Sequence, residues 1–203
     1  MLKKRTITHR GDTIVEVMLA ITIFSLIVVS SMAIMNQGLY TAQRAQEISL
    51  VRSQIDSQAE ALRFLNASYI NAFRGESVDY SGTPAGEWHK IISNPNNLVN
   101  SVSAFGTTGA SCPSTPDRSF IVNAKKAIVV DIPIATASTF SMVEYDSDNN
   151  VHSVQGIWIE ALRSDANNHS GYVDFHIRAC WDSPGQSTPV TLGTIVRLYE
   201  PRD

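Results

Sequence analysis

The sequence lacks the motifs that mark common enzyme classes. Its 203 residues contain no G-x-S-x-G nucleophile elbow, no phosphate-binding P-loop and no H-E-x-x-H zinc motif. The five histidines do not have the spacing of a ligand set. We therefore predict that the chain is not an enzyme, binds no metal and needs no cofactor. An anchored hydrolase whose active site is assembled from distant residues is the alternative.

Cysteine is scarce. The only two cysteines are Cys112 and Cys180, and a pair so far apart in the sequence makes a poor metal site. An even number of cysteines in an exported domain is a disulfide candidate, which would contribute about 2–4 kcal/mol to stability. Two unpaired thiols are the alternative.

Charge is absent from one long stretch. Residues 17–43 contain no charged residue, and residues 17–35 are almost continuously apolar. Such a run has the length of about 17–25 residues that a membrane-spanning helix needs. The first 11 residues contain four basic residues and no acid, and a basic head is retained on the cytoplasmic side of a membrane. We expect a single-pass protein of the cytoplasmic membrane with its C-terminal domain outside.

A secretory signal peptide would begin in a similar way. Signal cores usually run about 7–15 residues and end at small residues. Here the apolar core is longer and continues through Ser30 and Ser31 into a helix-compatible sequence without a Pro or Gly break. The sequence thus disfavours cleavage after the apolar core, whereas an ordinary uncleaved anchor remains compatible with it.

The residues around the start of the apolar run form a recognisable pattern. A short basic leader ends in Gly11, Glu16 follows five positions later, and an unbroken helix-forming apolar segment comes next. The run TIVEVMLAI has a threonine, two aliphatic residues, a glutamate and further aliphatic residues. This pattern resembles the class III signal of type IV pilins and of the pseudopilins of type II secretion systems.

The resemblance implies a processing route and a set of partners. A prepilin peptidase would cut between Gly11 and Asp12, so that residues 1–11 are a removed leader and residues 12–38 form the transmembrane and filament-core helix. In the family, the same enzyme methylates the new amino terminus, which is most often an apolar residue; in this chain it is Asp12. The implied partners are other pilin or pseudopilin subunits, the peptidase, an assembly platform in the inner membrane, and the membrane itself.

The acid at the edge of the apolar run has a physical interpretation of its own. A carboxylate there is unfavourable without a partner, and ion pairs are stronger in low dielectric than in water. In the family, this glutamate meets the amino terminus of a neighbouring subunit and sets the stagger of a helical filament. We predict this role for Glu16, with Asp12 as a competitor for the amine. Snorkelling of Glu16 to the headgroups is the alternative.

Beyond Gly38 the apolar residues recur at spacings of three and four, with charged residues mostly between them. The recurring positions are Ile48, Val51, Ile55, Ala59, Leu62, Leu65, Tyr69 and Phe73. They predict that residues 39–74 continue the membrane helix as an amphipathic helix that ends near Gly75. Gly38 is expected to bend or loosen this helix, because glycine costs about 1 kcal/mol in a helix interior.

The rest of the chain predicts a loop region followed by strands. Residues 75–126 are rich in Gly, Ser, Pro, Asn and Thr and predict a long connecting region with one short element around residues 88–92. A linker between two domains is the alternative. Residues 127–203 predict an antiparallel β-sheet head with strands at 127–132, 140–145, 151–162, 172–181 and 194–199. The fold class is then α+β and pilin-like, with the apolar face of the sheet on the helix and Cys180 on the other face.

The sequence gives only weak support for two possible binding sites in the head. Asp146, Asp148 and Asn150 alternate as in the first half of a calcium loop, but the EF-hand glycine and glutamate are missing, so a solvated turn is favoured. Lys125, Lys126 and Arg118 form a possible patch for nucleic acid. Removing the four basic residues of the leader leaves 12 basic against 19 acidic residues, a net charge of −7. The net charge therefore disfavours nucleic-acid binding driven by bulk charge.

Together these observations predict a structural, minor subunit of a type IV pilus or of a type II secretion pseudopilus. The subunit would be stored in the cytoplasmic membrane and then assembled into an extracellular or periplasmic filament. The alternative is an uncleaved, membrane-anchored extracellular binding module for a surface ligand or DNA.

Overall fold

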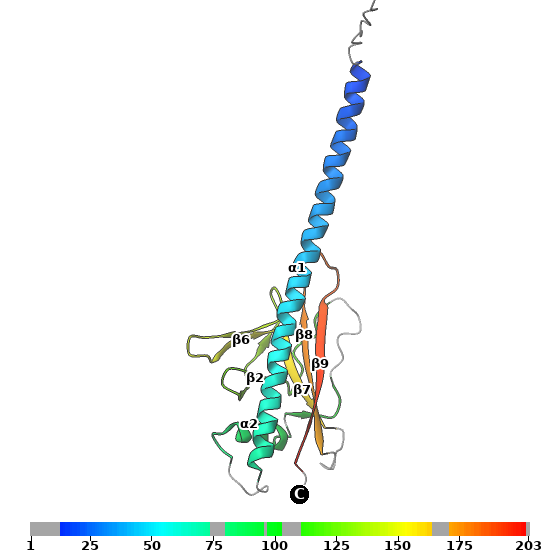
Figure 1. Ribbon diagram of the computed structural model, residues 1–203. Coiled ribbons are helices and arrows are strands. Elements are labelled where there is room, and N and C mark those ends of the chain that lie inside the picture. The colour runs from blue at the N-terminus through cyan, green and yellow to red at the C-terminus, as the bar shows by residue number, and fades with distance from the viewer. Residues whose placement is uncertain (1–12, 74–79, 96, 103–110, 164–170, 202–203) are drawn as a thin grey trace, which may run out of the picture. The chain divides into compact units, whose positions relative to one another are not determined.

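The structure is a computed structural model that describes residues 13–73, 80–95, 97–102, 111–163 and 171–201. The chain divides into two compact units, residues 1–43 and residues 44–203, and we call the second unit the head. Helix α1 (Ile14–Ala72) contributes residues to both units (Figure 1). Its bounds are close to the predicted ones, and the helix is not interrupted at Gly38.

The described part of the head contains, besides α1, one further helix and nine strands. The helix is α2 (Pro84–Ser93). The strands are β1 (Leu98–Val99), β2 (Ile121–Asn123), β3 (Ile128–Val130), β4 (Ile134–Ala135), β5 (Met142–Tyr145), β6 (Val151–Gln155), β7 (Ile157–Leu162), β8 (Tyr172–Trp181) and β9 (Val190–Tyr199). The head is therefore of the α+β class, as predicted.

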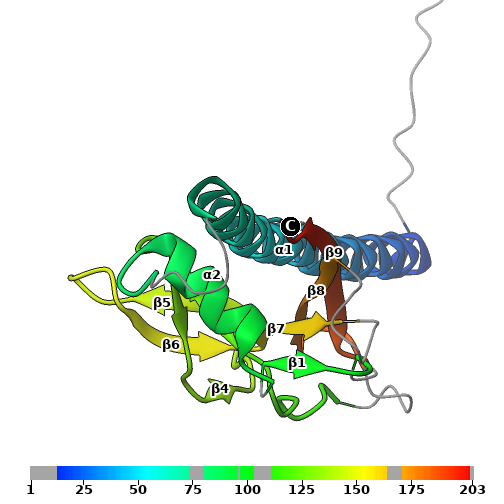
Figure 2. The ribbon, with the colours of Figure 1, turned by 90° about the horizontal axis from the view of Figure 1, so that it is seen from below.

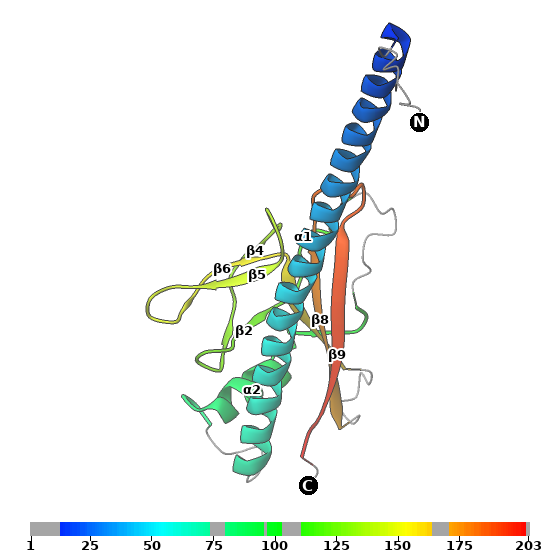
Figure 3. The same cartoon turned by 45° about the horizontal axis from the view of Figure 1, so that its top comes forward.

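The strands form three sheets. The largest has the order β1-β7-β8-β9, a second pairs β2 with β3, and a third has the order β4-β6-β5. Neighbours are antiparallel except for β1 with β7 and β4 with β6, which are parallel. Figure 2 shows β1 beside β7, and Figure 3 shows β8 and β9 side by side. The predicted antiparallel head is thus correct in its main strands but incomplete, since the sheets are mixed.

The prediction for residues 75–126 needs correction. This segment contains α2, β1 and β2, and its side chains Trp88, Ile91 and Phe120 belong to the buried core. It is thus part of the head, which excludes a plain linker between two domains. Helix α2 begins at a Thr83 cap whose hydroxyl accepts a hydrogen bond from the Gly86 amide at 3.2 Å, with Pro84 at the first helical position.

The predicted strand over residues 151–162 is two strands. Gly156 separates β6 from β7 and has φ of +62°, a conformation that favours glycine. Because of this break, the residues before Gly156 join one sheet and the residues after it join another.

The core of the head lies between the second half of α1, α2 and the sheets. The predicted apolar face of α1 is buried from Val51 to Tyr69, and Leu62 and Leu65 are completely inaccessible. The predicted inner face of β8 is also buried, and Trp88 packs on Phe175 with ring centroids 5.4 Å apart. This burial is the main force that holds α1 to the sheets.

Candidate functional site

Two of the predicted site residues, Gly11 and Asp12, lie outside the described residues. The third, Glu16, lies in the first turn of α1, and its amide donates to the Thr13 carbonyl at 2.9 Å. An acid in this position suits the positive end of the helix dipole. Its side chain is exposed within the unit that contains it.

The segment after Glu16 exposes an unusual amount of apolar surface. Residues 14–40 of α1 are all exposed, and the large apolar side chains there are 37–79% accessible. Soluble monomers rarely present continuous apolar surface of this kind, so it marks a membrane or protein contact. By length and composition alone, α1 is able to cross a membrane.

The polar hydroxyls within this segment bond to the helix itself. Thr22 donates to the Leu19 carbonyl at 2.8 Å, and Ser25 to the Ile21 carbonyl at 2.8 Å. Ser30, Ser31 and Thr41 make the same kind of bond, at 2.7, 2.8 and 3.0 Å, to carbonyls one turn earlier. A hydroxyl that is already bonded avoids most of the free-energy cost of burial in an apolar medium.

In the part of α1 that belongs to the head, two buried polar side chains form hydrogen bonds to residues in or next to the strands. The buried Glu47 carboxylate accepts hydrogen bonds at Oε2 from Trp181 Nε1 at 3.1 Å and from Ser183 Oγ at 2.6 Å. The buried Gln58 amide pairs with both backbone groups of Val122, at 2.8 and 2.9 Å. Sequence reasoning missed these residues, although both fall in phase with the apolar face of the helix.

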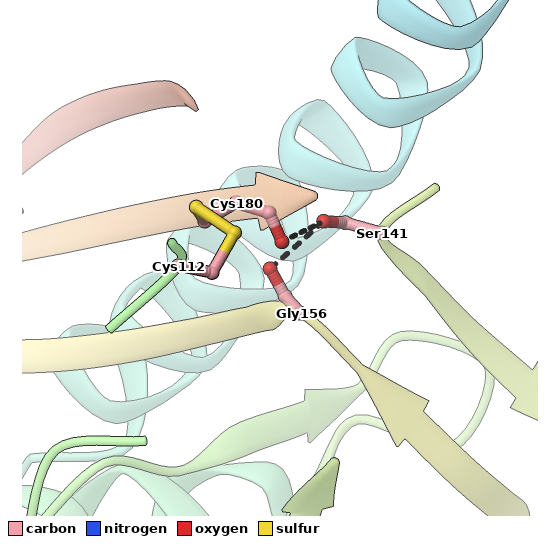
Figure 4. Close-up of a disulfide and its surroundings, with 4 residues drawn as sticks. All are labelled: Cys112, Ser141, Gly156 and Cys180. Carbon is pink, nitrogen blue, oxygen red and sulfur yellow. Dashed lines mark hydrogen bonds between the residues drawn. A yellow bond between two sulfur atoms is a disulfide. The ribbon is translucent and has the colours of Figure 1, made fainter. Parts of the chain in front are cut away.

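The predicted disulfide joins Cys112 to Cys180 across 68 residues (Figure 4). Cys180 lies on the outer face of β8, as expected, so the bridge fastens the segment after residue 111 to the sheet. Beside it, Ser141 Oγ donates to the carbonyls of Gly156 and Cys180, at 2.8 and 3.2 Å. This cluster ties together the two larger sheets.

The outer face of the four-stranded sheet, the face opposite the core, carries paired charges. Glu160 is completely buried and accepts from Arg178 Nη1 at 3.2 Å. Arg197 holds Asp174 with two bonds of 2.7 Å, and the Arg197 hydrogen bond lowers the pKa of the Asp174 carboxyl. Burial, and then the charge of Arg178, lowers the pKa of His176, which favours the neutral imidazole.

The calcium alternative has no support in the geometry. Asp146 Oδ1 accepts the amides of Asp148 and Asn150, at 2.9 and 2.8 Å, and Oδ2 accepts the Asn150 side-chain amide at 3.0 Å. The carboxylate therefore organises a turn, as the solvated-turn prediction requires. In the described part of the chain, no group of three or more His, Cys, Asp and Glu side chains is placed to hold a metal ion.

The three cations of the possible nucleic-acid patch have protein partners. Lys125 Nζ contacts Asn149 Oδ1 at 3.0 Å, and Lys126 Nζ contacts Asn150 Oδ1 at 2.5 Å. Arg118 Nη1 donates to a carbonyl of β1 at 3.0 Å. The lysines thus join the β2–β3 hairpin to the β5–β6 hairpin, which gives them a structural role.

Comparisons of the chain with protein-family models, curated proteins and solved structures found no match.

Proposed function

We propose that this chain is a structural, minor subunit of a type IV pilus or of a type II secretion pseudopilus. A prepilin peptidase removes residues 1–11, and the mature chain is stored in the cytoplasmic membrane through α1. Assembly transfers the apolar part of α1 from lipid into a bundle of similar helices, which forms the core of a filament outside the membrane.

One observation carries this proposal: the first part of helix α1 exposes an apolar surface, whereas the second part is packed in the head. Residues 14–40 expose apolar side chains with no charge after Glu16, whereas from Glu47 onward the same helix packs on a folded head. A helix that only anchored the head would not need an acid at the N-terminal end of its apolar run. Glu16 is suited to pair with the amino terminus that cleavage creates in a neighbouring subunit.

Mass spectrometry of the purified protein tests the processing step. We expect the chain to begin at Asp12 when it is produced together with a prepilin peptidase. Intact Met1 under those conditions contradicts the proposal and supports the uncleaved binding module.

The pairing role of Glu16 has its own test. Glu16→Ala should reduce incorporation into sheared filaments at least about tenfold, because an ion pair in low dielectric is lost, while membrane insertion is unchanged. Ser25→Ala is a matched control, since it removes a hydroxyl that bonds only to its own helix. Normal incorporation of the Glu16 variant would show that this acid does not set the register.

A further inference from the structure

Strand β9 is an edge strand of unusual regularity. It lies at the end of the order β1-β7-β8-β9 and pairs with β8 over all ten of its residues, without a register shift. It contains no Pro or Lys, and its one charged residue is Arg197. Prolines, lysines and bulges are the usual devices that keep an edge strand from pairing with another chain, so β9 lacks this protection.

The hydrogen bonds fix which backbone groups of β9 point away from β8. Glu200 donates its amide to the Gly171 carbonyl at 2.9 Å, and this ladder alternates along β8 and β9. The backbone amides and carbonyls of the even-numbered residues therefore point to β8, and those of the odd-numbered residues point outward. The first set is Val190, Leu192, Thr194, Val196 and Leu198, and the second is Thr191, Gly193, Ile195, Arg197 and Tyr199. The Asn66 side chain bonds to the outward carbonyl of Tyr199 at 2.9 Å, which agrees with this assignment.

Side chains cap exposed backbone groups at other strands of the head. Gln58 covers both groups of Val122 in β2, and Glu87 accepts the Val129 amide of β3 at 3.0 Å. Among the described residues, the only side-chain cap on β9 is at Tyr199, and the outward backbone groups from Thr191 to Arg197 have no hydrogen-bond partner.

The surface beside this edge is apolar and electrically compensated. Ile195 and Tyr199, at 62% and 59% accessible, are the most exposed large apolar side chains of the described head. A hollow of about 510 Å³ lies next to Ile195, where Gly193 has no side chain. The nearby cations Arg178 and Arg197 are paired with Glu160 and Asp174, so an incoming group meets no uncompensated charge.

We infer that the outer edge of β9, from Thr191 to Arg197, binds an extended, uncharged peptide segment of another protein as an added strand. Unpaired ladder amides and carbonyls are matched by another extended backbone, and the hollow at Gly193 accepts a bulky apolar side chain of that segment. A second copy of β9 in parallel register would place two Arg197 side chains together, which disfavours it. A second copy in antiparallel register is the competing occupant, and the crosslinking test below distinguishes it. The inference does not depend on the proposed filament function.

The test uses the full chain in detergent and a fluorescent probe peptide of alternating threonine and valine with a central phenylalanine, blocked at both ends. We expect saturable binding by fluorescence anisotropy. Ile195→Pro removes one outward amide from an edge position that tolerates proline, and it should weaken binding at least about tenfold. Ile195→Val retains the amide and should bind within about twofold of the unchanged chain.

Three results would overturn the inference. One is the absence of saturable binding up to about 1 mM peptide. Another is equal binding of a peptide that is N-methylated at every residue, since it keeps its side chains but neither of its edges can donate to the ladder. The third is efficient self-crosslinking of an Ile195→Cys variant, with none for a control in which the exposed Ser147, between β5 and β6, is changed to Cys, because the occupant would then be a second copy of this chain.

Discussion

At the scale of single residues, Gly156 shows how one position controls the packing of two sheets. It lies between β6 and β7 with φ of +62°, and a Cβ atom there would lie 2.5 Å from the Cys180 carbonyl oxygen. It would also lie 2.8 Å from Ser141 Oγ, which donates to the Gly156 carbonyl. Both the backbone conformation and the space therefore require glycine.

We predict that Gly156→Ala lowers the free energy of unfolding by about 3 kcal/mol, the sum of backbone strain and overpacking. Urea unfolding of the full chain in detergent, followed by circular dichroism, measures this change. Gly82→Ala is the matched control, because Gly82 has φ of +73° but open space around it. It should lose about 1 kcal/mol from strain alone. Equal losses in the two variants would contradict the steric explanation.

At the scale of elements, the disulfide and the helix side chains hold the head by different means. Gln58 and Glu47 fasten α1 to the sheets through hydrogen bonds that stay out of water. The Cys112–Cys180 bridge instead restricts the unfolded chain, because it closes a loop of 68 residues.

Replacing both Cys112 and Cys180 with alanine should reduce stability by about 4 kcal/mol on the chain-entropy estimate for a loop of this length. Trp158 is 2% accessible and pairs with Arg178, two residues from Cys180 in β8, so loss of the bridge should let acrylamide quench it more readily. Thermal unfolding and fluorescence quenching of the full chain check both effects. A variant with unchanged stability would show that the bridge contributes nothing to the folded head.

The elements that the sequence predicts well are those with a strong period. The apolar face of α1 and the alternation of β8 were predicted with nearly correct bounds because one face of each is buried. Helix α2 carried a capping threonine and a proline at its start, and these signals were underused. Strand β2 has three residues and pairs with the nearby β3, and a run this short gives only a weak local pattern. Strand β1 has two residues and pairs with β7, far away in the chain, so no local pattern could reveal it. The roles of Gln58 and Asn66 depend in the same way on distant strands.

At the scale of the whole molecule, the absence of charge in one segment of α1 is what allows this helix to enter a membrane. A charge placed in the middle of a membrane-spanning helix is unfavourable by about 2.5–3.5 kcal/mol, and the penalty falls towards the ends. Residues 17–43 are free of charge over the whole of this length.

We predict that Val28→Arg reduces membrane integration of the full chain at least about tenfold, as this free-energy penalty requires. Alkaline extraction of membranes, followed by immunoblotting, measures the integrated fraction. Gln43→Arg adds the same charge next to Arg44, at the end of the apolar run, and should integrate normally. Full integration of the Val28 variant would argue against a spanning role for α1.

The hydroxyls of α1 that bond to their own helix bear on the proposed transfer of this helix from lipid into a helix bundle. Thr22, Ser25, Ser30, Ser31 and Thr41 keep their bonds whether lipid tails or neighbouring helices surround them. On the proposed assembly route, transfer of α1 from lipid into a helix bundle would break none of these bonds, so the hydroxyls would add little to the free energy of that transfer. These side chains would therefore oppose neither assembly into the proposed filament nor return to the membrane.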